Sequence, residues 1–387
     1  MRARDLGLPF DGCCGPYNAI TDVPGVEVGY STIIQGESHS DNGVDSDFAR
    51  TGVTAILPRG KQRSSVFAGH AVLNGNGEMT GIHWVTDSGF IHGPIMITNT
   101  HSVGVVRDST TKWMLQNDAY PLAYDDKDQP VPGLSFFYPV VAETFDGLLN
   151  NINGFKVKEE NVLEAINSAH SGPIAEGNIG GGTGMVCHQF KGGTGTASRK
   201  VTTGVGEYTL GVLVQANHGL REELTVKGIP LGKEITDLMP DFPSRAPKAG
   251  SGSIIVIFAT DAPFLPWQLS KIARRASMGI GRLGGGNHTS SGDIFLAFST
   301  ANENAFTHTQ SQVDYMGDDQ IDPFYIAATQ ATEEAIMNAL VSAETLAGRN
   351  CNTAYALPHD RVKEILCRYQ NIVDLYTAQG EQENKES

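Results

Sequence analysis

Residues 249–258, AGSGSIIVIF, place a run of small residues directly before a wholly apolar segment rich in β-branched side chains. Such a segment is typical of a strand that is buried on both of its faces. Ser253 stands at the entrance to this predicted strand, immediately after Gly252. The serine either belongs to a loop that enters the core, or becomes a new chain terminus whose amine and hydroxyl form an active site.

The second interpretation has a clear chemical basis. A serine hydroxyl can be activated by a separate base or by the α-amine of its own residue once that residue is N-terminal. The sequence contains no GxSxG nucleophile elbow on which a hydrolase-fold triad could be built. An α-amine has a pKa of about 7.7–8.0, so near pH 7 a useful fraction is neutral and can accept the hydroxyl proton. Gly252 favours cleavage because it has no Cβ to hinder attack on its carbonyl. Both interpretations of Gly252–Ser253 remain open at this point.

Charge argues against some classes of partner. The chain has 387 residues, with 43 acidic and 28 basic side chains and a formal net charge of −15. Nucleic acids and anionic membrane surfaces both require basic patches, so neither is an expected partner. No stretch approaches the roughly 18 apolar residues of a membrane span, and the first residues, MRARDLGLPFDGCCG, lack the apolar core of a signal peptide.

Metal and disulfide patterns are not evident. The five cysteines are odd in number and form no CxxC pairs, which indicates free thiols in a reducing compartment. The lack of a signal-peptide pattern predicts a cytoplasmic protein. There is no HExxH motif, and Asp41, Asp45 and Asp47 lack the ligand order of an EF-hand. We therefore expect neither a metal nor a cofactor.

The order of elements predicts a layered α/β domain. Residues 220–252 contain four prolines among charged residues and predict an exposed connector. A polar tail, GEQENKES, ends the chain. Strands are expected at 51–57, 94–98, 102–106, 137–142, 208–215, 254–259 and 293–299, and helices at 162–170, from Asp261 to Gly279, at 329–347 and at 360–368.

Glycine is gathered in four clusters, at 75–81, 177–185, 191–196 and 279–293. The cluster GNIGGGTGM is not a P-loop because no Lys-Ser or Lys-Thr follows it, and it lacks the context of a dinucleotide fingerprint. The clusters are better explained as tight turns and as places where backbones approach one another closely.

Several longer motifs carry a resemblance to a known family. The chain resembles the DmpA-type family of L-aminopeptidases/D-amino-acid esterases and β-peptidyl aminopeptidases over nearly its whole length. The motifs are ITDVPGVEVGYSTI (20–33), LNGNGEMTG (73–81), ITNTHSVG (97–104), EGNIGGGTGM (176–185), FKGGTGTASR (190–199), LVQANHG (213–219), AGSGSIIVIFATDAPFLPWQL (249–269) and TSSGDIFLAFST (289–300).

The resemblance implies a self-processing N-terminal-nucleophile hydrolase with a four-layer αββα sandwich, similar in fold to the ornithine acetyltransferases. One cut before Ser253 would leave a larger chain, 1–252, and a smaller chain, 253–387, folded together as one domain. Family members use no metal or cofactor and assemble as homo-oligomers, so a tetramer of processed protomers is expected.

The resemblance also assigns catalytic roles. Ser253 would be the nucleophile and its free amine the general base. Ser291 and Asp293 would lie beside it, Ser291 relaying a hydrogen bond to the nucleophile and Asp293 orienting the ammonium; their spacing places both side chains on one face of a strand. Asn217 would donate to the oxyanion. The alternatives are a polar turn for the Ser-Gly-Asp segment and a left-handed turn for Asn217.

Substrate-binding roles follow from the same source. Glu143, in VAETFDG, would bind the free ammonium of the substrate, although a lone glutamate at a strand end is usually solvated surface. Phe145 departs from relatives that carry a tyrosine with a proposed catalytic hydroxyl, so either that hydroxyl is dispensable or this enzyme handles its oxyanion or amine differently. Gly182, within the 177–185 cluster, would help to wall the substrate pocket.

The expected function is therefore that of a serine aminopeptidase or amidase that releases N-terminal L-, D- or β-amino acids from short peptides, amides and esters. Three alternatives remain. One is an endo-type amide hydrolase of ω-amino-acid oligomers. Another is an acyltransferase like the ornithine acetyltransferases, which usually expose threonine instead of serine. The third is an uncleaved binding or scaffold protein.

Overall fold

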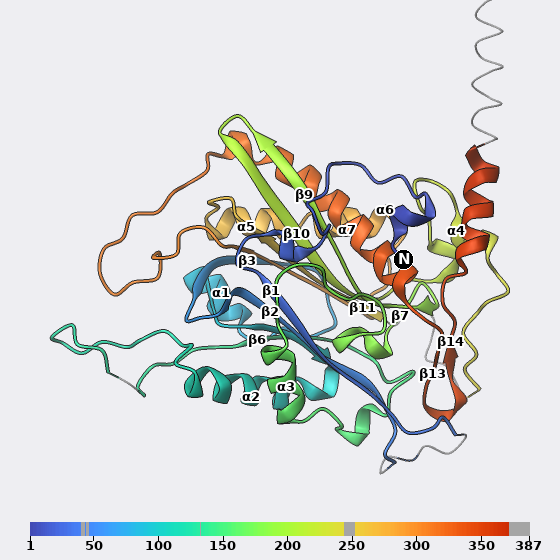
Figure 1. Cartoon of the computed structure of the whole chain (residues 1–387), viewed down its shortest axis with the longest axis horizontal. Coiled ribbons are helices and arrows are strands. Elements are labelled where there is room, and N and C mark those ends of the chain that lie inside the picture. The colour runs from blue at the N-terminus through green and yellow to red at the C-terminus, as the bar shows by residue number, and fades with distance from the viewer. Residues whose placement is uncertain (40–42, 44–45, 132, 244–251, 371–387) are drawn as a thin grey trace, which may run out of the picture.

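The computed structural model describes the chain except for residues 40–42, 44–45, 132, 244–251 and 371–387 (Figure 1). The predicted polar tail and the end of the connector, with Ser251, lie outside the described residues. None of the described helices combines the length and apolar character needed to cross a bilayer.

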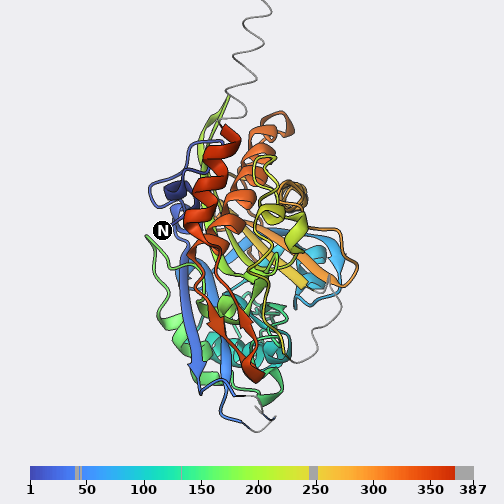
Figure 2. The same cartoon turned by 90° about the vertical axis from the view of Figure 1, so that its right-hand side faces the viewer.

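Two mixed sheets face each other, and each carries helices on its outer side (Figures 1 and 2). The first sheet has the order β1 (Glu27–Gln35), β2 (Ala49–Lys61), β5 (Ile95–Asn99), β6 (Val140–Thr144). The second has the order β4 (Phe90–His92), β3 (Ser65–Gly75), β12 (Ser291–Ser299), β11 (Gly252–Thr260), β10 (Gly206–Asn217), β9 (Gly193–Thr203). This is the predicted four-layer αββα sandwich.

Helices α2 (Val103–Gln116) and α3 (Glu159–Asn167) pack on the first sheet. Helices α5 (Pro266–Ala273), α6 (Ala276–Arg282) and α7 (Asp322–Ser342) cover the second. The helix that begins at residue 359 lies beside α7 (Figure 2), and the His359 Nε2 is 2.8 Å from the Val341 carbonyl oxygen of α7. The smaller elements are α1 (Ile82–Ser88), α4 (Leu231–Glu234) and the short strands β7 (Val186–Cys187), β8 (Phe190–Lys191), β13 (Leu346–Ala347) and β14 (Thr353–Ala354).

Strand β11 is the centre of the molecule, which explains its composition. Ile254, Val256 and Phe258 pack toward α5, α6 and α7, whereas Ile255 and Ile257 pack into the core between the two sheets. Because successive side chains of a strand point to opposite faces, a strand covered on both sides must be apolar throughout. The prediction of a fully buried strand from IIVIFA is confirmed.

Two element predictions are wrong. Residues 102–106 begin helix α2 and are not a strand; Val103, Val106, Thr110 and Trp113 lie on its buried face at helical spacing, and the β-branched run at its start hid that period. Asp261 does not cap a helix, since its carboxylate accepts a hydrogen bond from the Thr209 N–H at 2.7 Å. The expected single helix after it is instead two, α5 and α6.

The connector is only partly as predicted. Leu224, Val226, Leu231 and Ile235 are buried, with at most 1% exposed, although they form little regular structure. The Arg221 guanidinium holds this segment by donating to four backbone carbonyls, among them Ile235 at 2.7 Å and Leu238 at 2.8 Å. Proline density correctly indicated irregular backbone, but the prediction that the whole segment is exposed is wrong.

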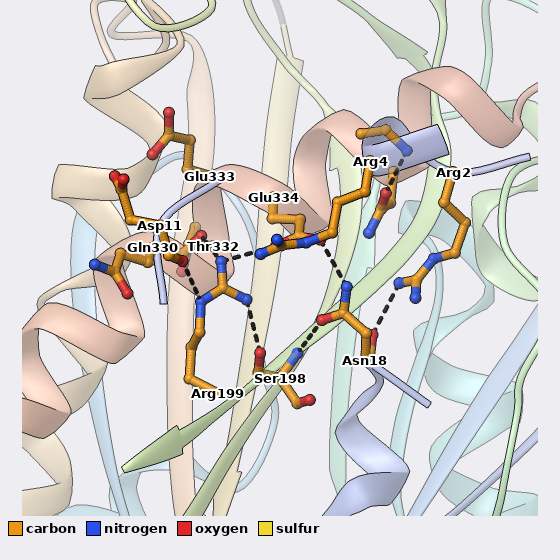
Figure 3. A network of polar contacts seen from close by, with 12 residues as sticks. Arg2, Arg4, Asp11, Asn18, Ser198, Arg199, Gln330, Thr332, Glu333 and Glu334 are labelled. Carbon is orange, nitrogen blue, oxygen red and sulfur yellow. Dashed lines mark hydrogen bonds and ion pairs between the residues drawn. The ribbon is translucent and has the colours of Figure 1, made fainter. Parts of the chain in front are cut away.

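A buried ionic network joins the two parts of the chain that a cut before Ser253 would separate (Figure 3). Glu334 of α7 accepts hydrogen bonds from Arg4 at 2.7 and 2.8 Å, from Arg199 at 2.8 Å and from Asn18 at 2.6 Å. Burial alone would raise the pKa of Glu334, but the hydrogen bonds from Arg4 and the charge of Arg199 hold it below its usual value. The network therefore attaches α7 to the N-terminal segment and to β9 without a covalent link.

Replacing Glu334 by alanine is expected to lower the free energy of unfolding by about 3–5 kcal/mol, because two arginines would lose their buried counter-charge. The matched control is Asp108→Ala, which removes an exposed i,i+4 ion pair with Lys112 and should leave the free energy of unfolding nearly unchanged. Denaturant titration of both variants measures the difference. Equal stability of Glu334→Ala and Asp108→Ala would contradict this role of the network.

Candidate active site

Ser253 is the second residue of β11 and lies between two strands that carry polar residues at the same level. It pairs with Asn217 on antiparallel β10 and with Gly292 on parallel β12. Ser253 shares the strand face of Ile255, so its Cβ points between the sheets, as does the Asn217 side chain. Both residues are buried, with 4% and 5% exposed.

Both polar atoms of the Asn217 side-chain amide make hydrogen bonds. Its Oδ1 accepts a hydrogen bond from the Val186 N–H at 2.8 Å, and its Nδ2 donates to the Phe145 carbonyl at 3.0 Å. An amide nitrogen has two N–H groups, so one remains for a ligand in a fixed direction. Asn217 is paired within β10 and is absent from the residues with positive φ, so the alternative of a left-handed turn is wrong.

Ser291 and Asp293 form a hydrogen-bonded pair at the start of β12. The Ser291 hydroxyl donates to Asp293 Oδ1 at 2.6 Å, while Asp293 Oδ2 is buried without a hydrogen-bond partner among the described residues. Burial raises the pKa of Asp293, and the hydrogen bond from Ser291 opposes that shift. Both residues belong to the strand, so the alternative of a polar turn is wrong.

The register decides which atom of Ser253 this pair can reach. Asp293 is opposite Ile254, and Ser291 is opposite Gly252, so both share the face of those residues and not that of the Ser253 Cβ. The pair is therefore placed to act on the backbone nitrogen of Ser253 more directly than on its hydroxyl. An ammonium at that nitrogen would supply the positive partner that Asp293 Oδ2 lacks.

Glu143 is a buried carboxylate beside this strand end. Its Oε1 accepts from the Glu78 N–H at 2.9 Å, and its Oε2 accepts from the Thr100 hydroxyl. A Cβ on Gly77 would lie 3.2 Å from both Glu143 Oε1 and the Cα of Gly292, the residue opposite Ser253. Glu143 is only 4% exposed, so it is not solvated surface.

Burial raises the pKa of Glu143, and the hydrogen bonds from Thr100 and Glu78 oppose that shift. Neither Glu78 nor Thr100 was predicted as a partner of Glu143, although both lie within the motifs 73–81 and 97–104. Little in the sequence indicated the contact with Glu78, because Glu78 contributes its backbone N–H, which any residue other than proline possesses.

Phe145 and Gly182 have different surroundings. The Phe145 ring is 42% exposed, and its carbonyl, not its ring, contacts Asn217. Gly182 is buried in a short 3₁₀ helix against Thr194 of β9, two strands away from β11. A role of Gly182 in the pocket wall stays a prediction.

Gly252 is required by a close approach of strands. A Cβ at this position would lie 2.5 Å from the Asn217 carbonyl oxygen and 2.9 Å from the His218 Cα. Any side chain would therefore push β11 away from β10 and displace Ser253 from Asn217. This is a second reason for glycine, in addition to access to its carbonyl.

Comparison with known proteins gives concordant matches. The profile of Peptidase family S58 matches residues 18–354. Proteins named beta-peptidyl aminopeptidase BapA are 51% identical over 383 residues in Sphingosinicella microcystinivorans (96% of this chain, 93% of that protein) and 42% identical over 379 residues in Sphingosinicella xenopeptidilytica (94% and 90%).

Among solved structures, the L-aminopeptidase D-Ala-esterase/amidase of Ochrobactrum anthropi superposes with a TM-score of 0.86 at 46% identity. The match covers 95% of this chain and 99% of that one. That structure is described as a prototype for the serine aminopeptidases and as a new variant among the Ntn hydrolase fold.

Proposed function

The chain belongs to peptidase family S58, and from that premise we propose that Ser253, freed at its amino side, is the catalytic nucleophile. The enzyme is a serine aminopeptidase of the N-terminal-nucleophile class, with the predicted fold and family. The assignment to Ser253 rests on its position. It lies at the start of the buried strand β11, between Asn217 of β10 and the Ser291–Asp293 pair of β12.

Self-cleavage of the Gly252–Ser253 peptide bond uses atoms that the chain already places next to each other. The Ser253 hydroxyl attacks the Gly252 carbonyl carbon, and its proton passes to the Ser253 nitrogen as the peptide bond breaks. The product is an ester between Gly252 and the Ser253 oxygen, together with a free amine. Water then hydrolyses the ester, which leaves a carboxylate on Gly252 and restores the hydroxyl. The strand that follows stays buried, so both groups of Ser253 remain in place.

Turnover repeats this chemistry on a substrate. The neutral amine of Ser253 accepts the hydroxyl proton while the oxygen attacks the substrate carbonyl, and the free N–H of Asn217 stabilises the oxyanion. The amine then gives the proton to the leaving nitrogen, and an acyl ester remains on Ser253. Water, deprotonated by the same amine, releases the acid. Asp293 orients the ammonium that forms in these steps.

The substrate is a peptide, amide or ester with a free amino terminus, and Glu143 binds its ammonium. N-terminal β-amino acids are among the residues released; the identity to proteins named beta-peptidyl aminopeptidases over almost the whole chain supports this. A homo-oligomeric assembly and a cytoplasmic location, both expected from the sequence, remain part of the proposal.

The aminopeptidase assignment is tested by acetylation of the substrate and by Glu143→Ala. Wild-type kcat/KM should fall sharply when the substrate amine is acetylated, because the buried carboxylate loses its counter-charge. Glu143→Ala should lose at least about 100-fold in kcat/KM on free peptides, as for one member of a buried charge pair. Because the pKa of Glu143 is raised, wild-type kcat/KM also falls as the pH is lowered through it. Equal use of acetylated and free peptides would favour an endo-hydrolase.

The role of Asp293 is tested by the pH profile of Asp293→Asn. An anion close to the Ser253 ammonium raises the pKa of that amine, so activity in the wild type appears only above the raised value. In Asp293→Asn the acid limb of kcat should move down by about one pH unit or more, and maximal kcat should fall because the base is poorly oriented. Processed Asp293→Asn with the wild-type profile would remove Asp293 from the mechanism.

A further inference from the structure

Three potential metal ligands that the mechanism does not use lie together behind Asn217. Cys187 ends β7, His188 follows it in the turn to β8, and His218 follows Asn217 at the end of β10. One ligand atom from each lies within 4.8 Å of the others. We refer to these three residues as the Cys-His-His cluster, and their exposed fractions are 0%, 0% and 3%.

The hydrogen bonds leave ring nitrogens of the cluster without partners. His188 Nδ1 is 3.0 Å from the Leu220 carbonyl, and since a carbonyl only accepts, Nδ1 carries the proton and Nε2 has the lone pair. The Nε2 atoms of His188 and His218 are both buried and have no hydrogen-bond partner among the described residues. Metal-bound histidines usually donate their other N–H to a carbonyl or carboxylate, as His188 does here.

The distances between the ligand atoms of the cluster fit a single small, thiophilic cation. Cys187 Sγ lies 3.8 Å from His218 Nδ1. Sulfur and nitrogen bound to one zinc ion at ordinary bond lengths and tetrahedral to trigonal angles are about 3.6–3.8 Å apart. The remaining ligand atoms need to approach by only about 1 Å to complete the set.

The backbone holds His188 in this place at a conformational cost. His188 and Gln189 have φ values of 45° and 57°, so two consecutive residues with side chains are left-handed. Such a conformation is unfavourable for residues that carry a Cβ. The His188 N–H donates to the His218 carbonyl at 2.6 Å, which fixes the turn against the end of β10.

A cluster without metal explains these contacts less well. A thiol hydrogen bond between Cys187 and His218 Nδ1 satisfies one ring nitrogen but leaves the buried Nε2 of His188 without a partner in the described part of the chain, which is unfavourable for a polar atom.

We propose that the Cys-His-His cluster binds one thiophilic d¹⁰ cation, Cu⁺ or Zn²⁺, through the Cys187 thiolate, His188 Nε2 and a ring nitrogen of His218. The thiol proton passes to solvent as the metal–sulfur bond forms, and both imidazoles bind as neutral ligands. Three ligands among the described residues suit trigonal Cu⁺, whereas tetrahedral Zn²⁺ would add a water. The proposal does not rest on the catalytic assignments above.

The expectation of no metal site rested on the absence of CxxC and HExxH motifs, in which the ligands are close in sequence. Here a hairpin supplies Cys187 and His188, and a different strand supplies His218. The Val186 N–H that holds Asn217 is adjacent to Cys187, so bound metal would also stiffen the support of the oxyanion donor.

The test is a titration of metal-free full-length protein that carries Cys13→Ser and Cys14→Ser, because those adjacent thiols are accessible and could bind soft metals. Zn²⁺ is titrated in competition with a chromophoric chelator, and Cu⁺ anaerobically in competition with bathocuproine disulfonate. At least one of the two should bind with one equivalent, and Co²⁺ should give a thiolate-to-cobalt charge-transfer band. Cys187→Ser should weaken binding at least about 100-fold and abolish the band, whereas Cys351→Ser, at an exposed cysteine, should change neither.

Failure to bind either Zn²⁺ or Cu⁺ stoichiometrically would overturn the proposal. So would affinity that is unchanged in both Cys187→Ser and His188→Gln. Circular dichroism establishes that each variant is folded before titration. If one of them does not fold, the other variant and the wild-type titration still decide the question.

Discussion

Ser253→Ala is expected to remain a single chain and to have no measurable peptidase activity. The substitution removes the atom that would attack the Gly252 carbonyl, so no free amine is generated. Nucleophile and base are thus lost together, and kcat should fall by at least about 10⁴-fold. A denaturing gel gives the processing state, and hydrolysis of amino-acid p-nitroanilides gives kcat. The buried strand after Ser253 is unaffected, so the variant should fold normally.

Two controls make this result specific. Ser253→Cys keeps a nucleophile and should still be processed, although slowly. Ser251→Ala should be processed and active like the wild type, because Ser251 is the nearest competing start and has no catalytic role in this account. A Ser253→Ala protein that is still cut and still hydrolyses peptides would exclude Ser253 as the nucleophile.

Asn217→Ala is expected to lower kcat by about 10²–10³-fold, equivalent to about 2.7–4 kcal/mol, because one preorganised oxyanion donor is lost. KM should change little, since the second N–H of the amide acts mainly on the charge that develops in the transition state. Self-processing should slow as well, because it passes through the same kind of oxyanion. Both rates are measured on purified protein, with kcat taken from the processed fraction.

A control for Asn217→Ala must distinguish the loss of the oxyanion donor from the loss of the structural hydrogen bonds that the same side chain makes. Its amide also accepts from Val186 and donates to Phe145, so truncation removes two structural hydrogen bonds. Asn217→Asp keeps an acceptor for Val186 but offers no N–H to an oxyanion, and it should lose as much kcat as alanine. Asn117→Ala, which removes an asparagine hydrogen bond to the Trp113 carbonyl at the C-terminal end of α2, should leave kcat unchanged. A kcat within about threefold of wild type in folded Asn217→Ala would contradict the oxyanion role.

Local composition was sufficient to predict the centre of the fold. The apolar run after Ser253 predicted a strand buried on both sides, and β11 is such a strand. The spacing of Ser291 and Asp293 predicted a shared strand face, and the two side chains are hydrogen-bonded. These predictions succeeded because each depends on neighbours within one element.

The remaining features depend on contacts between distant segments. Residues 102–106 have strand-like composition, but packing against the first sheet makes them helical. The connector folds because Arg221 and buried leucines hold it, which proline density does not reveal. The partners of Glu143 likewise come from two other segments of the chain.

The central claim is that the bond between Gly252 and Ser253 is cut by the protein itself. N-terminal sequencing and intact mass of the purified wild-type protein test it most directly. We expect two fragments without a disulfide between them, the smaller about one-third of the chain and beginning Ser-Ile-Ile-Val-Ile. A smaller fragment that begins at Ser251, or an active protein that remains one uncut chain, would contradict it.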